Sequence, residues 1–180
     1  MFLLFCFCEN PLTNKNCINK GKNDYDNYMV KFALNQNTCN ELDLLDFIAF
    51  SKEFDGIEIN FEKLNEILSK RTTIQEILEL LEVYDLQAIS IFGLEDFSLS
   101  SERDYKLTIL PKMRIMMNYL NKLESDLLLV SPSFFDETLD PRIIPKRRII
   151  NKTRKRLHHI SKIAFKNDIK IGFEFLKVQR

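Results

Sequence analysis

Short apolar, strand-like runs alternate along this chain with longer stretches that have helical periodicity. Each run lasts four to six residues and is rich in Val, Ile, Leu and Phe, which is typical of buried strands. Regular alternation of this kind predicts parallel strands joined by right-handed helical crossovers, and hence an α/β fold. The five predicted strands are Val30–Asn35, Gly56–Asn60, Ala88–Phe92, Leu127–Val130 and Lys170–Phe175.

The stretches between the strands repeat apolar residues three and four positions apart. In one of them Ile74, Ile77, Leu78 and Leu81 share a face. This spacing is typical of amphipathic helices that pack against a core. The predicted helices are Leu42–Glu53, Thr73–Tyr84, Glu102–Lys122 and Arg142–Asn167.

The two faces of the predicted strands differ in character. Successive side chains of a strand point to opposite faces, so that Ile57 and Ile59 oppose Glu58 and Asn60. A doubly wound sheet carries helices on both faces, and both would then be apolar. One bulky and one small or polar face instead favour a partial (β/α)8 TIM barrel of five parallel strands, with an inner face that opens at the strands' carboxyl ends. In the other strands the bulky apolar face carries Val30, Phe32 and Leu34, then Ile89 and Ile91, then Ile171, Phe173 and Phe175. The small or polar face of the same strands carries Ala33 and Asn35, then Ala88 and Ser90, then Gly172 and Glu174.

Glu174 lies on the predicted inner face, near the carboxyl end of the last strand. A buried carboxylate is costly unless it is paired or binds a metal ion. Two interpretations stay open: a carboxylate directed at a ligand, and a structural one that forms an ion pair or lies at a solvated strand end. Glu58 shares this face but is a weaker candidate, because a structural hydrogen bond or ion pair explains it equally well.

Polar residues follow the first and fourth strands. Asn35 and Gln36 offer amide groups to sugar hydroxyls, and the alternative is turn chemistry that starts the next helix. Ser131, in the loop after the fourth strand, is a candidate substrate contact and equally a candidate loop cap.

Residues 1–28 begin with the apolar run MFLLFCFC and then lose all periodicity. The run is too short for a membrane span, which needs about 20 residues, and it lacks the features of a secretory signal. We predict an irregular or disordered extension over residues 1–28, a folded domain over residues 29–180, and a cytoplasmic location. The four cysteines do not have the paired spacing of a zinc site and are expected to be free thiols.

The charge of the chain is balanced, with 26 Lys and Arg against 26 Asp and Glu. No overall field therefore attracts a polyanion, and we expect neither a nucleic acid nor a membrane as partner. Seven basic residues lie between Lys146 and Arg156. We interpret them as the solvated face of a helix whose Ile150 and Leu157 pack inward.

Three segments resemble the sugar phosphate isomerase/epimerase group, which are xylose isomerase-like TIM barrels. They are FALNQNT, FDGIEIN and DIKIGFEFL, within a stretch from Met29 to Leu176. The resemblance implies a divalent metal ion (Mn²⁺, Co²⁺, Zn²⁺ or Mg²⁺) held by Glu, Asp, His and Glu, and proton transfer on a small sugar or sugar phosphate. It also implies that Glu174 is the first of these metal-binding carboxylates.

The chain departs from this group because the later strands and their metal ligands are missing, whereas a barrel typically has about 250 residues. We therefore expect a product truncated after the fifth strand, whose activity requires strands from another chain or a longer product. The histidines, His158 and His159, point about 100° apart on a helix and do not replace the missing ligand together. The alternative is a non-catalytic barrel remnant or binding module that self-associates through an open sheet edge. An endonuclease-like DNA binder is disfavoured by the zero net charge.

Overall fold

The computed structural model describes residues 5–8, 30–70, 72–133 and 146–174. Six strands in this part form one sheet, in which their spatial order is also their order along the chain. Strands β2 to β6 are parallel, whereas β1 pairs antiparallel with β2. The expected five parallel strands alternating with helices are thereby confirmed. The strands are β1 (Phe5–Cys8), β2 (Val30–Asn35), β3 (Gly56–Asn60), β4 (Gln87–Leu94), β5 (Leu127–Val130) and β6 (Lys170–Phe173).

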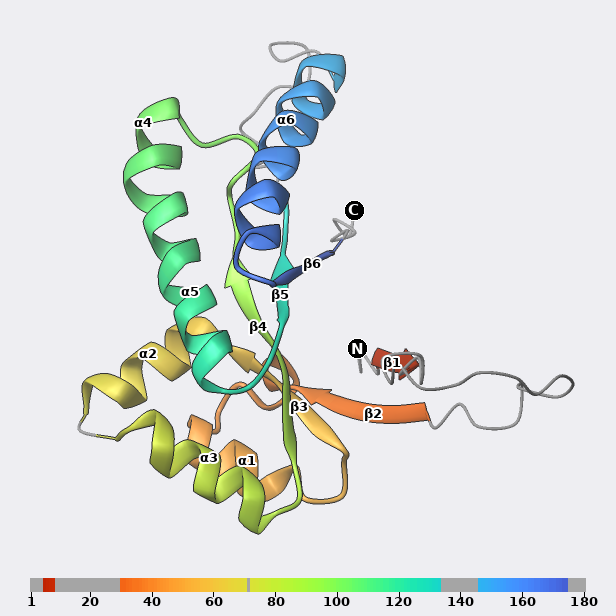
Figure 1. Ribbon diagram of the computed structural model, residues 1–180, viewed down its shortest axis with the longest axis vertical. Coiled ribbons are helices and arrows are strands. Elements are labelled where there is room, and N and C mark those ends of the chain that lie inside the picture. Colours follow the sequence, from red (N-terminus) through yellow and green to blue (C-terminus); the bar gives the residue numbers. More distant parts are fainter. Residues whose placement is uncertain (1–4, 9–29, 71, 134–145, 175–180) are drawn as a thin grey trace, which may run out of the picture.

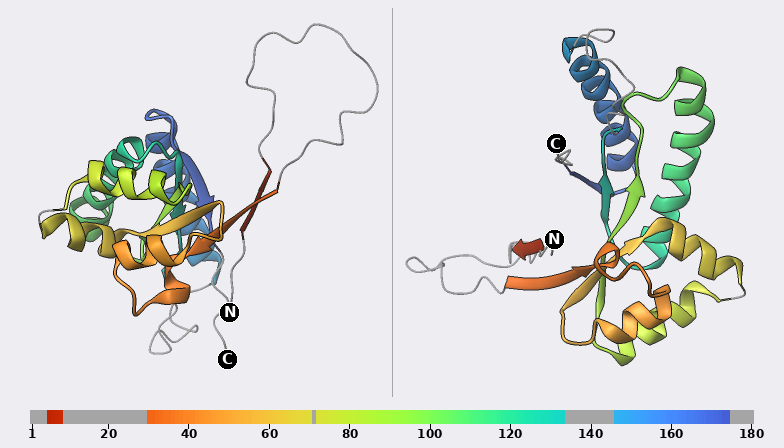
Figure 2. Two further views of the ribbon diagram at one scale, coloured as in Figure 1. Left: turned by 90° about the horizontal axis from the view of Figure 1, so that it is seen from below. Right: turned by 180° about the vertical axis from the view of Figure 1, so that it is seen from behind.

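Helices connect the parallel strands and cover one face of the sheet (Figure 1), as the view from behind also shows (Figure 2). The other face carries no helix in the described part of the chain, and we call it the inner face. The helices are α1 (Leu44–Phe50), α2 (Phe61–Ser69), α3 (Ile74–Val83), α4 (Glu102–Asp104), α5 (Leu110–Lys122) and α6 (Lys146–Phe165), with a 3₁₀ turn η2 (Gln36–Cys39) and a π-helical segment η3 (Tyr105–Ile109).

Several helices begin at side chains that accept main-chain hydrogen bonds. Asp43 caps α1, Asn60 caps α2, and Thr73 starts α3 with a capping box, which supplies partners for N–H groups that the helix itself leaves free. The sequence patterns above do not predict α2. Its signal is the cap Asn60, followed by Phe61 and Leu64 at helical spacing, both of which are buried.

The predicted helix over Glu102–Lys122 is present but changes geometry along its length. It begins as α4, passes through the π-helical segment η3 and continues as α5, with Pro111 in the first turn of α5. Proline has no N–H and clashes with the carbonyl group one turn earlier. The π-helical segment η3 ends at Ile109, two residues before Pro111, and the helix continues through the proline.

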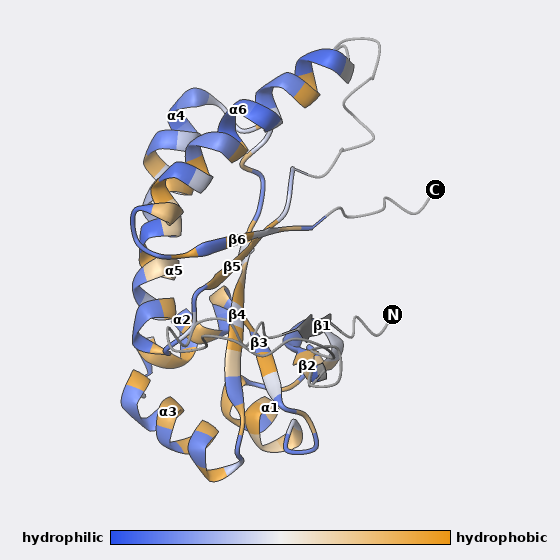
Figure 3. Ribbon diagram, turned by 45° about the vertical axis from the view of Figure 1, so that its right-hand side comes forward, coloured by the Kyte–Doolittle hydropathy of each residue, from blue (hydrophilic) through white to orange (hydrophobic). Residues whose placement is uncertain are grey.

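The hydrophobic core lies between the sheet and the helices. Phe47 of α1, Leu64 of α2 and Met116 of α5 are fully buried against Ile59 and Ile91 of the sheet layer. The central strands are mostly hydrophobic, whereas the helices carry many hydrophilic residues (Figure 3). Among the helices of the described ranges, none is both long enough and apolar enough to cross a bilayer.

Two apolar residues expected to pack inward are exposed instead. Phe32 is 46% exposed and Ile150 is 55% exposed. The start of β2 and the start of α6 both project beyond the layer of packed elements (Figure 1). Among the described residues, neither side chain is covered by an opposing surface.

In strand β4 the side chains are divided between the core and the inner face differently from the prediction. Ile57 pairs with Ala88 and Glu58 pairs with Ser90, so Ile89 is an extra residue between two paired positions. Such a bulge reverses the alternation of side chains. Ala88 therefore packs against the core, while Ile89 approaches Gly56 on the inner face. The sharing of one face by Ile89 and Ile91 was a wrong prediction.

The amino-terminal extension is described only at Phe5–Cys8. These four residues form β1, so that part of the predicted irregular segment is a strand. The rest of residues 1–28 lies outside the described residues, as do residues 142–145 of the fourth predicted helix and Phe175 of the fifth predicted strand. The division into an extension and a folded domain stays a prediction.

Candidate functional site

The carboxyl ends of the five parallel strands meet along one edge of the sheet, which we call the carboxyl edge. It is formed by Asn35, Asn60, Glu95, Ser131 and Glu174 with the loops that follow them. Barrels of parallel strands bind their ligands at this edge, because the loops after the strands gather there.

Glu58 is fully buried in the middle of β3, on the inner face. Asn35 Nδ2 donates to its Oε2 at 2.8 Å, and Ser90 Oγ donates to its Oε1 at 3.1 Å. Burial raises the pKa of Glu58 above its usual value, hydrogen bonds from Asn35 and Ser90 lower it, and the nearby Glu174 raises it. These bonds are the structural hydrogen bonding considered for Glu58, and its role in substrate binding stays a prediction. Ser90, which the sequence did not single out, is brought to Glu58 by the bulge at Ile89.

Asn35 and Gln36 connect the ends of β2 and β3. Asn35 Oδ1 accepts a hydrogen bond from Asn37 N at 2.9 Å, which is the turn chemistry considered above. Gln36 is fully buried, and its Oε1 accepts from Asn60 N at 2.9 Å. Its Nε2 has no partner among the described residues. A buried donor without a partner is costly, so this amide is a candidate contact for a bound hydroxyl group.

Glu174 follows β6 directly and is half-buried. Its N–H donates to Val130 O at 3.0 Å, which continues the pairing of β6 with β5. Burial raises the pKa of Glu174, a hydrogen bond with the Ser131 side chain lowers it, and the Glu95 carboxylate raises it. The structure therefore brings together two predicted site residues, Ser131 and Glu174, and adds Glu95.

Arg156 of α6 is a key residue of this region that sequence reasoning missed. It belongs to the basic run interpreted as a solvated face, yet it is only 5% exposed, and that interpretation is wrong for this residue. Its guanidinium stacks on the ring of Tyr105, 4.3 Å from the centroid, and bonds to Glu102 at 2.8 Å. Its remaining acceptors are the carbonyl oxygens of Phe97, Ser98, Ser100 and Ser101 and the hydroxyl of Ser100.

These acceptors lie in residues 95–101, the loop that follows β4, which we call the β4 loop. Lys152 also donates to two of its carbonyl oxygens, at 3.2 and 2.7 Å, and Ser133 Oγ accepts from Leu99 N at 2.8 Å. Phe97 is fully buried and packs edge-on against Phe173, with 6.2 Å between ring centroids. The β4 loop is therefore fixed between α6 and the end of β6, beside Glu174.

The residues that the structure describes do not make up a metal site on their own. No group of three or more His, Cys, Asp or Glu side chains in these ranges is placed to hold an ion. His158 and His159 are exposed on α6, where His159 Nδ1 contacts Tyr105 Oη at 3.0 Å. Glu174 thus has no described partners that would complete a coordination shell, and its role as a metal ligand stays a prediction.

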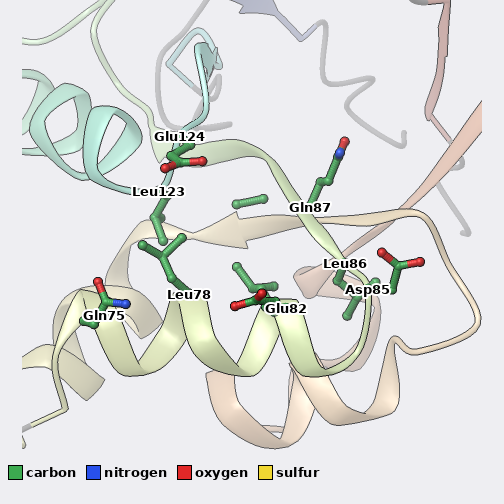
Figure 4. A pocket seen from close by; sticks show the side chains of 10 residues that line it. Gln75, Leu78, Glu82, Asp85, Leu86, Gln87, Leu123 and Glu124 are labelled. Atoms are coloured by element: carbon green, nitrogen blue, oxygen red, sulfur yellow. The ribbon is translucent and has the colours of Figure 1, made fainter.

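A pocket with a volume of about 720 Å³ lies at the opposite edge of the sheet (Figure 4). It is lined by α3, the start of β4 and the two residues that follow α5, and it includes Glu82, Asp85 and Glu124. Parallel strands begin at this edge. The predicted site residues are absent from its lining, and the pocket does not belong to the carboxyl edge.

The raised pKa of Glu58 predicts a pH dependence of stability. Because the folded-state pKa lies above the unfolded one, the folded protein binds this proton more tightly, so the stabilising contribution is present below the unfolded pKa and is lost as pH rises through the folded pKa. Glu58→Gln keeps an acceptor for Asn35 and removes the titration. Urea unfolding between pH 4 and pH 8 should show a smaller loss of stability in this variant than in the wild type. An unchanged pH dependence beside the exposed control Glu82→Gln would contradict this assignment.

No protein-family model matches the sequence, and the comparison with curated proteins gives no match. Solved structures do match in fold. The IolI protein with a bound zinc atom aligns with a TM-score of 0.70 and 23% identity, over 80% of this chain and 51% of that one. A xylose isomerase domain containing protein from Salmonella typhimurium LT2 gives 0.58 and 17%, over 78% and 47%. D-psicose 3-epimerase with D-tagatose, from Clostridium cellulolyticum H10, gives 0.54 and 16%, over 72% and 46%.

These similarities concern the fold, since every identity is below 25%. The chain spans about half the length of the solved structures it matches. Its five parallel strands occur in the same sequential order as in a barrel, with helices on one face. The described chain has the fold of about half of a (β/α)8 TIM barrel.

Proposed function

We propose that the carboxyl edge binds a small sugar or sugar phosphate, and that Glu174 supplies one ligand to a divalent metal ion there. The observation that carries this proposal is the half-buried Glu174 carboxylate at the end of a barrel strand, which no described Lys or Arg is placed to neutralise. A desolvated carboxylate of this kind favours a cation as partner. The remaining ligands would come from residues outside the described part or from a second chain.

The substrate contacts in this proposal are those predicted from the sequence. Gln36 offers its unpartnered Nε2, and Ser131 offers a hydroxyl group beside Glu174. Asn35 lies between Glu58 and the η2 turn, with 6% of its surface exposed. Glu58 is fully buried and would act beneath the ligand by orienting Asn35 and Ser90.

The contents of two solved structures of similar fold support the choice of ligand. One contains zinc and another contains D-tagatose. Carboxylate oxygen suits Mn²⁺, Mg²⁺, Co²⁺ and Zn²⁺. Metal-dependent proton transfer on a sugar, as the sequence resemblance implies, is the activity that we propose for a complete site.

Calorimetric titration with Mn²⁺, Co²⁺ and Zn²⁺ tests the role of Glu174. We expect the wild-type chain to bind at least one ion and Glu174→Gln to weaken that binding at least about a hundredfold, because the amide lacks the charge that attracts the ion. Glu82→Gln, which removes an exposed carboxylate at the opposite edge, is the matched control and should bind like the wild type. Equal binding by both variants, or no binding by any chain, would refute the metal role.

The second candidate is a non-catalytic binding module that self-associates. It is favoured by the position of β6 at the end of the sheet, where β5 is its neighbour among the described strands. Unpaired edges promote association with another strand. Sedimentation equilibrium distinguishes the two candidates: a dimer that binds neither metal nor sugar favours the module, and metal-dependent sugar binding favours the isomerase-like site.

A further inference from the structure

The charges of the chain balance overall but are separated between its helices. Helices α5 and α6 contain no Asp or Glu, and α6 alone carries eight Lys and Arg residues among its 20 positions. Helix α3 has the opposite composition, with three Glu residues and no Lys or Arg. Helices α1, α2 and α3 lie at one end of the helical layer, and α5 and α6 lie towards the other end (Figure 1). The folded chain is therefore electrically polarised although its net charge is zero.

The exposed cations of α6 lie on one side of the helix, which we call the basic face. The buried residues Arg156, Ile160 and Ala164 mark the side that packs towards the sheet. The cations on the opposite side form two rows at intervals of seven residues, because seven residues are close to two helical turns. The rows consist of Arg147 and Arg154, and of Arg148, Lys155 and Lys162. None of the ion pairs between described residues involves these five side chains.

An acidic face of similar construction lies on α3. Its residues are exposed and lie on the side of α3 opposite the buried Ile77 and Leu81. They occur at intervals of three residues, which keeps neighbouring side chains close together. The acidic face consists of Glu76, Glu79 and Glu82, with Asp85 in the turn that follows. Among the described residues, no Lys or Arg forms an ion pair with Glu79 or Glu82.

Each face also exposes an apolar side chain between its charges. Val83 is 74% exposed and directly follows Glu82, and Ile150 is 55% exposed between Arg147 and Arg154. Protein interfaces combine apolar contacts with a polar rim. A nucleic acid or an anionic lipid surface would complement the basic face alone and would leave the acidic face without a partner. A second copy of this chain complements both faces at once.

From these observations we infer that two copies of the chain associate, with the basic face of each copy on the acidic face of the other. A two-fold axis repeats the contact, so that each copy uses both of its faces and the assembly closes as a dimer. Complementary charges orient the two copies and exclude arrangements that bring like charges together. This contact lies on the helical layer, away from the strand edge considered above, and it does not depend on a ligand at the carboxyl edge.

Sedimentation equilibrium of the full chain at two salt concentrations tests the association. The Debye length falls from about 10 Å at 0.1 M salt to about 3 Å at 1 M, so salt weakens contacts between exposed charges. We expect a dimer at about 0.05 M NaCl, with a dissociation constant that rises at least about tenfold at about 0.5 M NaCl. A chain that stays monomeric at low salt, or a dimer that salt does not weaken, overturns the inference.

Charge reversal on each face separately locates the contact. One variant combines Lys155→Glu with Lys162→Glu, and the other combines Glu79→Lys with Glu82→Lys; all four positions are exposed. Each variant alone brings like charges together in both contacts and should be monomeric. An equimolar mixture of the two should form a heterodimer, because opposite charges then meet again in both contacts.

Glu41→Lys reverses an exposed charge on neither face and is the control. It should dimerise like the wild type, and circular dichroism checks that every variant is folded. Dimers of either reversed variant alone, or a mixture that stays monomeric, would contradict the inference. A monomeric wild type that binds duplex DNA through α6 would assign the basic face to a nucleic acid and would overturn the inference as well.

Discussion

Arg156→Ala should lower the free energy of unfolding by about 1–3 kcal/mol, because it leaves buried main-chain carbonyl oxygens without a hydrogen-bond partner. The side chain is 5% exposed and bonds to Glu102 and to four carbonyl oxygens of residues 97–101. Truncation leaves those acceptors without this partner and opens a space beside the ring of Tyr105. Urea unfolding followed by circular dichroism measures the loss.

Two further variants separate the specific contacts of Arg156 from the general basic charge of α6. Arg154→Ala removes an exposed charge on the same helix and should change stability by less than about 0.5 kcal/mol. Arg156→Lys keeps the charge but loses the planar fork that reaches several acceptors at once, and an intermediate loss is expected. Equal effects of Arg154→Ala and Arg156→Ala would show that the buried bonds do not stabilise the fold.

Phe97→Ala should cost about 3–5 kcal/mol, as is usual for truncation of a buried aromatic side chain. Phe97 is fully buried and packs edge-on against Phe173. The cavity would lie under the β4 loop and beside the strand that leads to Glu174. Thermal unfolding monitors stability, and sugar binding by the same variant reports on the loop.

Phe165→Ala is the control for Phe97, because Phe165 is 82% exposed and its truncation should change stability by less than about 0.5 kcal/mol. Phe97→Leu fills most of the volume and should recover part of the loss. A small effect of Phe97→Ala would mean that the β4 loop is held by its hydrogen bonds alone.

Much of the fold follows from periodicity that is local in the sequence. The runs at Val30–Asn35, Gly56–Asn60 and Leu127–Val130 match the observed strands because apolar β-formers are bounded there by polar residues. Helix α2 was missed because it starts directly at the end of β3 with no loop between them. The strand β1 was missed because its four residues are ordered by pairing with β2, a contact far away in the sequence.

The candidate site depends more on register than on residue type. Glu58 and Asn35 were identified as inner-face residues, but their hydrogen bond depends on the pairing of β2 with β3. Ser90 reaches Glu58 only because Ile89 bulges out of register. No pattern in a single strand specifies either relation.

Arg156 illustrates a different reason for failure. It shares one helix face with Ile160 and Ala164, which are fully buried and follow at intervals of four residues. This four-residue spacing was the available signal. The prediction followed the seven-residue spacing from Ile150 to Leu157 instead, which defines an apolar face rotated slightly away from the observed buried face. Charged residues are seldom fully buried unless they are paired, and the acceptors of Arg156 lie in a loop more than 50 residues earlier.

The most direct test of the central claim is to map sugar binding onto the sheet by nuclear magnetic resonance. The ¹⁵N-labelled chain is titrated with D-tagatose in the presence of Mg²⁺, and the main-chain amide shifts are followed residue by residue. The account predicts that shifts concentrate at the carboxyl edge, at Gln36, Ser131 and Glu174, while Asp85 and Glu124 at the opposite edge do not move. Shifts confined to the opposite edge, or no shifts at saturating sugar, would contradict the assignment of the carboxyl edge as the ligand site.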